Sequence, residues 1–229
     1  GAVSFVTAPN FEAPADAGAN NVYDLVVTAS DGTLSASRSV AITVQNTNEA
    51  PVITSPSSAT VTENATGIAY QAAATDPDAG TTLSYALSGT DAARFTINAA
   101  TGAVSFVTAP NFEAPADAGA NNVYDLVVTA SDGTLSASRS VAITVQNANE
   151  APVVTSGSSA TVVENATGIA YQAAATDPDA GTTLSYALSG TDAARFTINA
   201  ATGAVSFVSA PNFEAPVDIG ANNVYDLVV

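Results

Sequence analysis

The sequence predicts an all-β protein built from tandem antiparallel β-sandwiches, and three observations carry this prediction. Residues 1–46 recur without change as residues 102–147. The repeat period, read from Gly1, Gly102 and Gly203, is 101 residues, which is the length of a sandwich domain and exceeds that of a solenoid repeat. Runs rich in Val, Thr, Ile and Tyr alternate with turn signals of Asn, Asp, Gly and Pro, as in antiparallel sheets.

The copies of the repeat differ at few positions. Seven substitutions separate them over the whole overlap, namely Thr47/Ala148, Ile53/Val154, Pro56/Gly157, Thr62/Val163, Thr108/Ser209, Ala116/Val217 and Ala118/Ile219. Each copy ends in a polar stretch followed by Pro51 or Pro152, which marks a linker. We therefore expect the C-terminal half of a repeat in residues 1–49, a complete repeat in 50–150, and the N-terminal part of a third in 151–229.

The two partial repeats should not be stable alone, because half a sandwich exposes strand edges and half a core. We expect the chain to be a segment of a longer array. An alternative is that neighbouring chains complete the terminal parts head to tail. Residues 1–27 and 203–229 are copies of the same part of the repeat, so this arrangement would leave one copy surplus.

The first half of the complete repeat should hold three strands. The first is broken, with pieces at Ile53 and Ala59–Glu63. Residues 68–75 form the next strand, and Asp76-Pro77-Asp78-Ala79-Gly80 ends it with a loop. Residues 83–87 alternate again and give the third strand.

Four further strands complete the repeat. Residues 94–98 and 103–107 flank Ala-Ala-Thr-Gly, a hairpin signal in which Gly102 supplies a positive φ. Residues 123–130 alternate clearly until Ser-Asp-Gly, and residues 136–146 reach the linker. Seven strands at this spacing predict a seven-stranded antiparallel Greek-key sandwich of the immunoglobulin-like type. The expected inward side chains are Val61, Ile68, Tyr70, Leu83, Tyr85, Phe95, Ile97, Val104, Phe106, Tyr124, Leu126, Val128, Val141, Ile143 and Val145.

Charge and missing residue types narrow the chemistry. Twenty-one acidic residues face four arginines, and the net charge is −17, which argues against nucleic acid and anionic membranes as partners. Without Cys or His, disulfides, thiol catalysis and most zinc or iron sites are excluded. A hard cation held by oxygen ligands remains, with calcium favoured over magnesium.

The acidic residues recur in one order along the repeat. Glu63 ends the first strand, and Glu113 follows the Thr-Gly hairpin within Pro-Asn-Phe-Glu. The linker reads Asn-Ala-Asn-Glu-Ala-Pro, an Asp-Pro-Asp at 177–179 follows it, and Ala-Ser-Asp-Gly occurs at 130–133. Over the whole repeat, and most of all from Arg94 to Gly133, this pattern resembles the cadherin-like tandem repeats of bacterial-type extracellular adhesins.

The resemblance implies calcium bound at the junctions between repeats. For the first junction it implies the ligands Glu12, Asn46, Asn48, Glu49, Asp76, Asp78 and Asp132. For the second it implies Glu63, Glu113, Asn147, Asn149, Glu150, Asp177 and Asp179. The family usually has Asp at positions 46, 147, 10 and 111, where this chain has Asn. Each change keeps an oxygen but removes a charge, so we expect one to three calcium ions per junction, and three less readily than in animal cadherins.

Other acidic residues have weaker claims. Asp91, Asp117 and Asp125 lie in loops or at an outward strand position, and we expect Asp117 and Asp125 to be surface charges. Asn64-Ala-Thr and its copy at Asn165 match a glycosylation acceptor, which is a coincidence if the source is bacterial.

The function implied is a structural and adhesive segment of a large extracellular or cell-surface protein, made rigid by junction calcium. Its partners are the neighbouring repeats of the same chain, with no nucleic acid and no membrane insertion. Two alternatives stay open, an extracellular filament or matrix fibre of identical chains and a carbohydrate-binding module for surface polysaccharide. An enzyme is not expected, because identical tandem domains suit reach and span better than turnover.

Overall fold

The computed structural model describes all residues from 1 to 229, and it separates into two compact units, Gly1–Gln146 and Asn147–Val229. Both units consist of strands and loops, apart from two short 3-10 turns, η1 (Ala92–Arg94) and η2 (Ala193–Arg195). No helix in the chain is long and apolar enough to cross a membrane.

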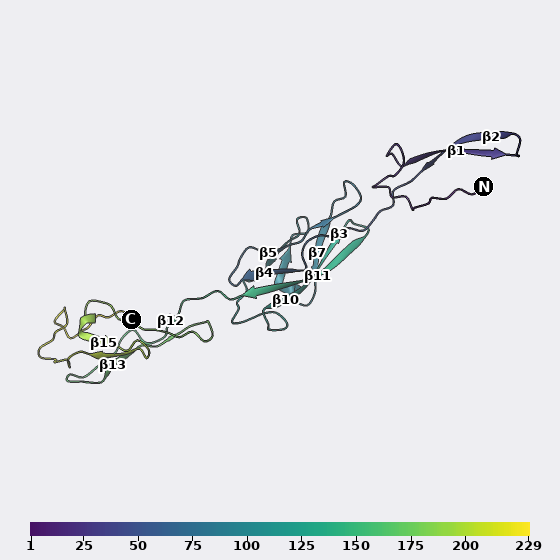
Figure 1. The fold of residues 1–229 in the computed structure, drawn as a ribbon. Coiled ribbons are helices and arrows are strands. Elements are labelled where there is room, and N and C mark those ends of the chain that lie inside the picture. Colours follow the sequence, from purple (N-terminus) through teal and green to yellow (C-terminus); the bar gives the residue numbers. More distant parts are fainter. The chain divides into compact units, whose positions relative to one another are not determined.

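The complete repeat is a two-layered sandwich (Figure 1). One layer is a four-stranded sheet in the order β4-β11-β10-β7, formed by Ser58–Thr62, Ser136–Gln146, Val123–Ser131 and Ser84–Ser88. The other layer has three strands in the order β5-β9-β8, formed by Ile68–Gln71, Ala103–Phe106 and Phe95–Ile97. A short pair, β3 (Val52–Ile53) with β6 (Ala74–Thr75), completes it. The all-β sandwich prediction is confirmed.

The first strand of the repeat is broken, as the sequence predicted, and the structure places its two pieces in different sheets. Its first piece, β3, pairs with β6, and its second piece, β4, pairs with β11. Pro56, which has no N–H to donate to a ladder, lies between the pieces. The β4–β11 pair is parallel, whereas the other strand pairs are antiparallel.

The core lies between the layers and is built on aromatic and β-branched side chains. Phe95 and Phe106 both meet the ring of Tyr124 edge to face, at centroid distances of 5.5 and 5.1 Å. Val104, Val128 and Ile143 have no exposed surface. The predicted inward set is largely confirmed, with one error: Ile68 is 61% exposed, while Ala69 and Tyr70 are buried. The pairing of β5 with β9 shifts register between Ile68 and Tyr70, and this irregularity breaks the alternation that the sequence suggested.

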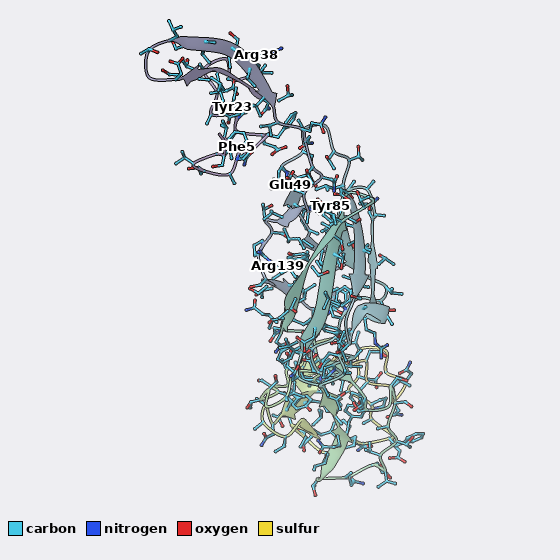
Figure 2. The ribbon with its side chains drawn as sticks, turned by 90° about the vertical axis from the view of Figure 1, so that its right-hand side faces the viewer. Phe5, Tyr23, Arg38, Glu49, Tyr85 and Arg139 are labelled. Atoms are coloured by element: carbon cyan, nitrogen blue, oxygen red, sulfur yellow. The ribbon has the colours of Figure 1, made fainter.

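The first partial repeat is a hairpin of β1 (Val22–Ser30) and β2 (Ser35–Thr43), in the same register as its copy β10–β11. Phe5 packs edge to face on Tyr23 at 5.1 Å, and both are labelled in Figure 2. The sequences are identical, but Leu25 is 37% exposed where its equivalent Leu126 is 1% exposed. Burial of these side chains therefore depends on the second layer of the sandwich.

The second unit contains three of the same pairings. They join β12 with β14, β13 with β16, and β15 with β16, formed by Val153–Val154, Ala175–Thr176, Ile169–Gln172, Ala204–Phe207 and Phe196–Ile198. A cavity of about 850 Å³ lies over its aromatic side chains, which include Phe196, Phe207 and Tyr225. The equivalent aromatic side chains of the complete repeat are covered by β11 and its neighbours.

Candidate metal site at the first linker

The first linker, residues 44–51, makes two of its hydrogen bonds to the complete repeat through one carboxylate, Asp78. Asp78 Oδ1 accepts a hydrogen bond from Asn46 Nδ2 at 2.6 Å, and Asp78 Oδ2 accepts one from the Glu49 backbone N–H at 2.9 Å. The loop that presents Asp78 is itself ordered, because Asp76 Oδ1 accepts the Asp78 N–H at 2.9 Å. Gly80 follows with φ +84°, a conformation that suits glycine and turns the chain back.

Three carboxylates converge at this point. Glu12, Glu49 and Asp78 each place an oxygen within 4.8 Å of the other two, and Figure 2 shows Glu49 where the linker meets the complete repeat. They come from three separate segments, namely the loop before β1, the linker, and the loop after β6. Oxygens at this mutual spacing suit one divalent cation, which calcium coordinates at about 2.3–2.6 Å.

The loop that carries Glu12 is held by residues that sequence reasoning did not assign to the site. Asn21 Nδ2 donates to the carbonyl oxygen of Phe11, next to Glu12, at 2.8 Å. Asp16 is 9% exposed and accepts backbone N–H groups from Gly18, Asn20 and Asn21. The signal in the sequence is the unbroken Asp-Ala-Gly-Ala-Asn-Asn run, in which Asn21 has φ +62°.

The complete repeat has the same anchor, and one expectation is corrected there. Asp117 is 6% exposed and is not a surface charge, because its oxygens accept the N–H groups of Asn121 and Asn122. Asp91 is also buried and accepts the N–H groups of Ala118 and Asp125. Asp125 itself is exposed, as predicted. Buried carboxylates with several N–H donors therefore set the loop before β10.

The electrostatics at the linker favour a cation. Burial raises the pKa of the half-buried Glu49 carboxyl, and the nearby carboxylates of Glu12, Asp78 and Asp76 raise it further. Two oxygens, Glu49 Oε2 and Asp76 Oδ2, are buried with no hydrogen-bond partner. Buried carboxylate oxygens without partners are costly, and coordination of a cation would satisfy them. This donor set, which contains only oxygens, fits calcium.

Asp132 lies at the same linker but is fastened differently. Asn48 Nδ2 donates to Asp132 Oδ2 at 2.7 Å, and the other oxygen accepts the N–H groups of Thr134 and Leu135. The Leu135 and Thr134 N–H groups, followed by the Asn48 amide, lower the pKa of Asp132 to about 2. Asp132 therefore stays ionised near neutral pH.

The second linker repeats these contacts within the second unit. Asn147 Nδ2 lies 2.7 Å from Asp179 Oδ1, and the Glu150 N–H lies 2.8 Å from Asp179 Oδ2. These two donors, the Glu150 N–H foremost, lower the pKa of Asp179. Asp177 accepts the Asp179 N–H, and Asn149 donates to the Glu150 carbonyl.

The remaining predicted residues, Glu63 and Glu113, belong to the complete repeat. Glu63 is 3% exposed and accepts the Phe112 N–H at 2.9 Å, which holds the segment preceding Glu113. Carboxylate oxygens of Glu63 and Glu113 lie within 4.8 Å of each other. The assignment of all fourteen residues as calcium ligands stays a prediction.

No model of a known protein family and no curated protein matches this chain. Solved structures do. A protocadherin gammaB7 EC3-6 cis-dimer aligns with a TM-score of 0.55 and 25% identity, over 83% of this chain and 51% of that one. The chain therefore spans about half the length of that structure. The fold is cadherin-like. Two further structures agree on this cadherin-like fold. Human protocadherin-24 EC1-2 has a TM-score of 0.54 and 22% identity, covering 74% of this chain and 82% of that one. Mouse cadherin-23 EC22-24 has a TM-score of 0.51 and 22% identity, covering 88% and 68%.

Proposed function

We propose that the chain is an adhesive, structural repeat segment of an extracellular protein whose linkers bind calcium and stiffen as they do so. The convergence of Glu12, Glu49 and Asp78 carries the proposal. The three carboxylates repel one another, and a buried oxygen of Glu49 has no hydrogen-bond partner. A divalent cation would turn this repulsion into cross-linking. Because the three residues come from separate segments, the ion would restrain the linker between repeats.

The same design is encoded at the second linker. Glu113, Glu150 and Asp179 are the sequence equivalents of Glu12, Glu49 and Asp78, one period later. A uniform set of ligands along an array would give a rod of uniform stiffness. We propose one to three ions per linker, with Asn in place of Asp reducing the charge available to hold them.

Extracellular location and adhesion are supported by the fold neighbours. One is described as the extracellular cadherin domains of protocadherin gamma B7, and another is a cis-dimer. By analogy, identical chains are the proposed lateral partners. An origin in a bacterial-type adhesin is proposed from the Asn-Glu-Ala-Pro linkers alone. The aromatic side chains of the complete repeat, including Phe95 and Tyr124, are buried in its core and offer no stacking platform for a sugar.

Limited proteolysis with and without a chelator tests the proposal. With calcium we expect the linkers at 44–51 and 147–152 to resist cleavage and the thermal transition to rise. After calcium is removed with a chelator, the carboxylates repel and cleavage at the linkers should accelerate. Magnesium at the same concentration is the matched control, because it accepts such a carboxylate-rich, flexible site poorly. Equal cleavage rates under all three conditions would refute the proposal.

A further inference from the structure

The linker asparagines present their nitrogen atoms, and not their oxygen atoms, to the acidic residues of the complete repeat. Asn46 Nδ2 lies 2.6 Å from Asp78 Oδ1, and Asn48 Nδ2 lies 2.7 Å from Asp132 Oδ2. An ionised carboxylate accepts hydrogen bonds and has none to give, so only the NH₂ end of each amide is compatible with these distances. The Asn147–Asp179 pair repeats the arrangement in the second unit at 2.7 Å.

One carboxamide has two mutually exclusive uses at such a position. Its NH₂ end neutralises part of a carboxylate's charge, and its carbonyl end coordinates a cation. The NH₂ end carries positive partial charge, so it would oppose a calcium ion in the same place. Turning the amide by half a rotation about its last side-chain bond exchanges the two ends.

An aspartate at the same position lacks this choice. It would supply a full charge to a cation, but without a cation it would repel Asp78 or Asp132. Compared with aspartate, asparagine therefore binds the ion more weakly, but it forms a hydrogen bond to the complete repeat when no ion is bound. The Glu49 N–H, which also donates to Asp78, directly follows Asn48 in the chain, so its exchange reports on the clasped linker.

We propose that the pairs Asn46–Asp78 and Asn48–Asp132, together called the amide clasp, hold the first linker to the complete repeat without metal. Calcium then tightens a linker that is already fastened. The calcium part rests on the proposed function, and the metal-free part stands by itself. The clasp predicts that an array with these linkers keeps part of its stiffness where calcium is scarce.

Hydrogen–deuterium exchange of the whole chain, read by mass spectrometry, tests the clasp. Peptides covering residues 45–53 and 146–154 differ in sequence, since Thr47 is replaced by Ala148 and Ile53 by Val154. Each linker is thus followed separately, and the second linker is an internal reference for variants of the first. The substitution Thr47→Ala is the matched control, because the second linker naturally has alanine there.

In chelator, the double variant N46A/N48A should exchange the 45–53 peptide at least about fivefold faster than the wild type, as expected for the loss of a hydrogen bond to a charged group. T47A should exchange like the wild type. N46D/N48D should exchange faster still in chelator, because two added charges face Asp78 and Asp132, but it should become the slowest of the variants in calcium. Unchanged far-ultraviolet circular dichroism would show that each variant folds.

Two results separate the possible failures. If N46A/N48A and the wild type exchange equally in chelator, the clasp does not exist. If the clasp variants behave as expected in chelator while calcium changes no protein's exchange, the clasp stands and the proposed calcium function fails.

Discussion

The backbone N–H of Glu49 donates to Asp78 Oδ2 across 2.9 Å, while the Glu49 side chain places a carboxylate oxygen within 4.8 Å of the same aspartate. The backbone of Glu49 therefore stabilises the negative charge of Asp78, whereas its side chain repels that charge. The second linker repeats the backbone half of this relationship, with Glu150 and Asp179 at 2.8 Å. Asp78 is thus the residue on which the first linker converges.

Asp78→Asn should cost more calcium affinity than any other single change at the first linker. It removes a charged ligand and, because an amide has a single acceptor oxygen, it leaves an acceptor for only one of the two donors, Asn46 Nδ2 and the Glu49 N–H. We expect at least the roughly 10- to 100-fold loss that follows removal of an outer-shell partner, measured by isothermal titration calorimetry. Asp125→Asn, which changes an exposed strand residue by the same charge, is the control and should bind calcium as the wild type does.

The pH dependence of the metal-free linker should have an acid maximum. The pKa of Glu49 is raised in the folded linker, so protonated Glu49 stabilises the fold. This contribution to the free energy of unfolding is fully present below the ordinary glutamate pKa of 4.5 and is lost as pH rises through the raised pKa. The negative charges of Glu12, Asp78 and Asp76 contribute to raising the pKa of Glu49. Asp132 acts oppositely, because its contribution is present above 3.8 and lost as pH falls to about 2. Thermal unfolding followed by spectroscopy in chelator should therefore give a higher transition temperature near pH 4.5 than at pH 7. A monotonic rise in stability from pH 4 to pH 7 would contradict this.

Asp117→Ala should destabilise the complete repeat by about 1–3 kcal/mol, because it leaves the N–H groups of Asn121 and Asn122 without their buried acceptor. Urea unfolding measures the change. Asp125→Ala in the same repeat should shift the midpoint little. If Asp117→Ala has the same urea midpoint as the wild type, the carboxylate that anchors the loop before β10 is dispensable.

Gly102→Ala should also destabilise the repeat, by roughly 1–3 kcal/mol or more. Gly102 has φ +72°, and a Cβ there would lie 2.6 Å from the carbonyl oxygen of Ala72. Gly133→Ala is a matched control, because Gly133 also has a positive φ of +100° but open space around its Cβ position. The difference between the two unfolding midpoints isolates the clash from the backbone strain, and equal midpoints would show no clash.

Sequence pattern was enough for the strands, because alternation and turn residues are local signals. It failed at Ile68, where the register shift opposite β9 turns the side chain outward, and such a shift depends on the partner strand. It also failed at Asp117, whose burial follows from backbone N–H groups that its loop folds around the carboxylate, although the Asp-Ala-Gly-Ala-Asn-Asn run is a turn signal. The parallel β4–β11 pair was not predicted, because a local pattern indicates a strand but not the direction of its partner.

At the first linker, the predicted residues Glu12, Glu49 and Asp78 do lie together, but the sequence did not predict how the linker asparagines are oriented. Asn46 and Asn48 were expected as oxygen ligands, yet their nitrogens face Asp78 and Asp132. Which end of an amide faces a carboxylate depends on hydrogen bonds formed only in the folded linker. The supporting role of Asp16 and Asn21 was missed for the same reason.

A crystal structure of the chain grown in calcium tests the central claim most directly. We expect a strong density peak at the first linker, bound at about 2.3–2.6 Å by carboxylate oxygens of Glu12, Glu49 and Asp78. The peak should disappear from crystals soaked in chelator. A first linker that holds only water at hydrogen-bonding distances, in crystals grown with millimolar calcium, would contradict the account.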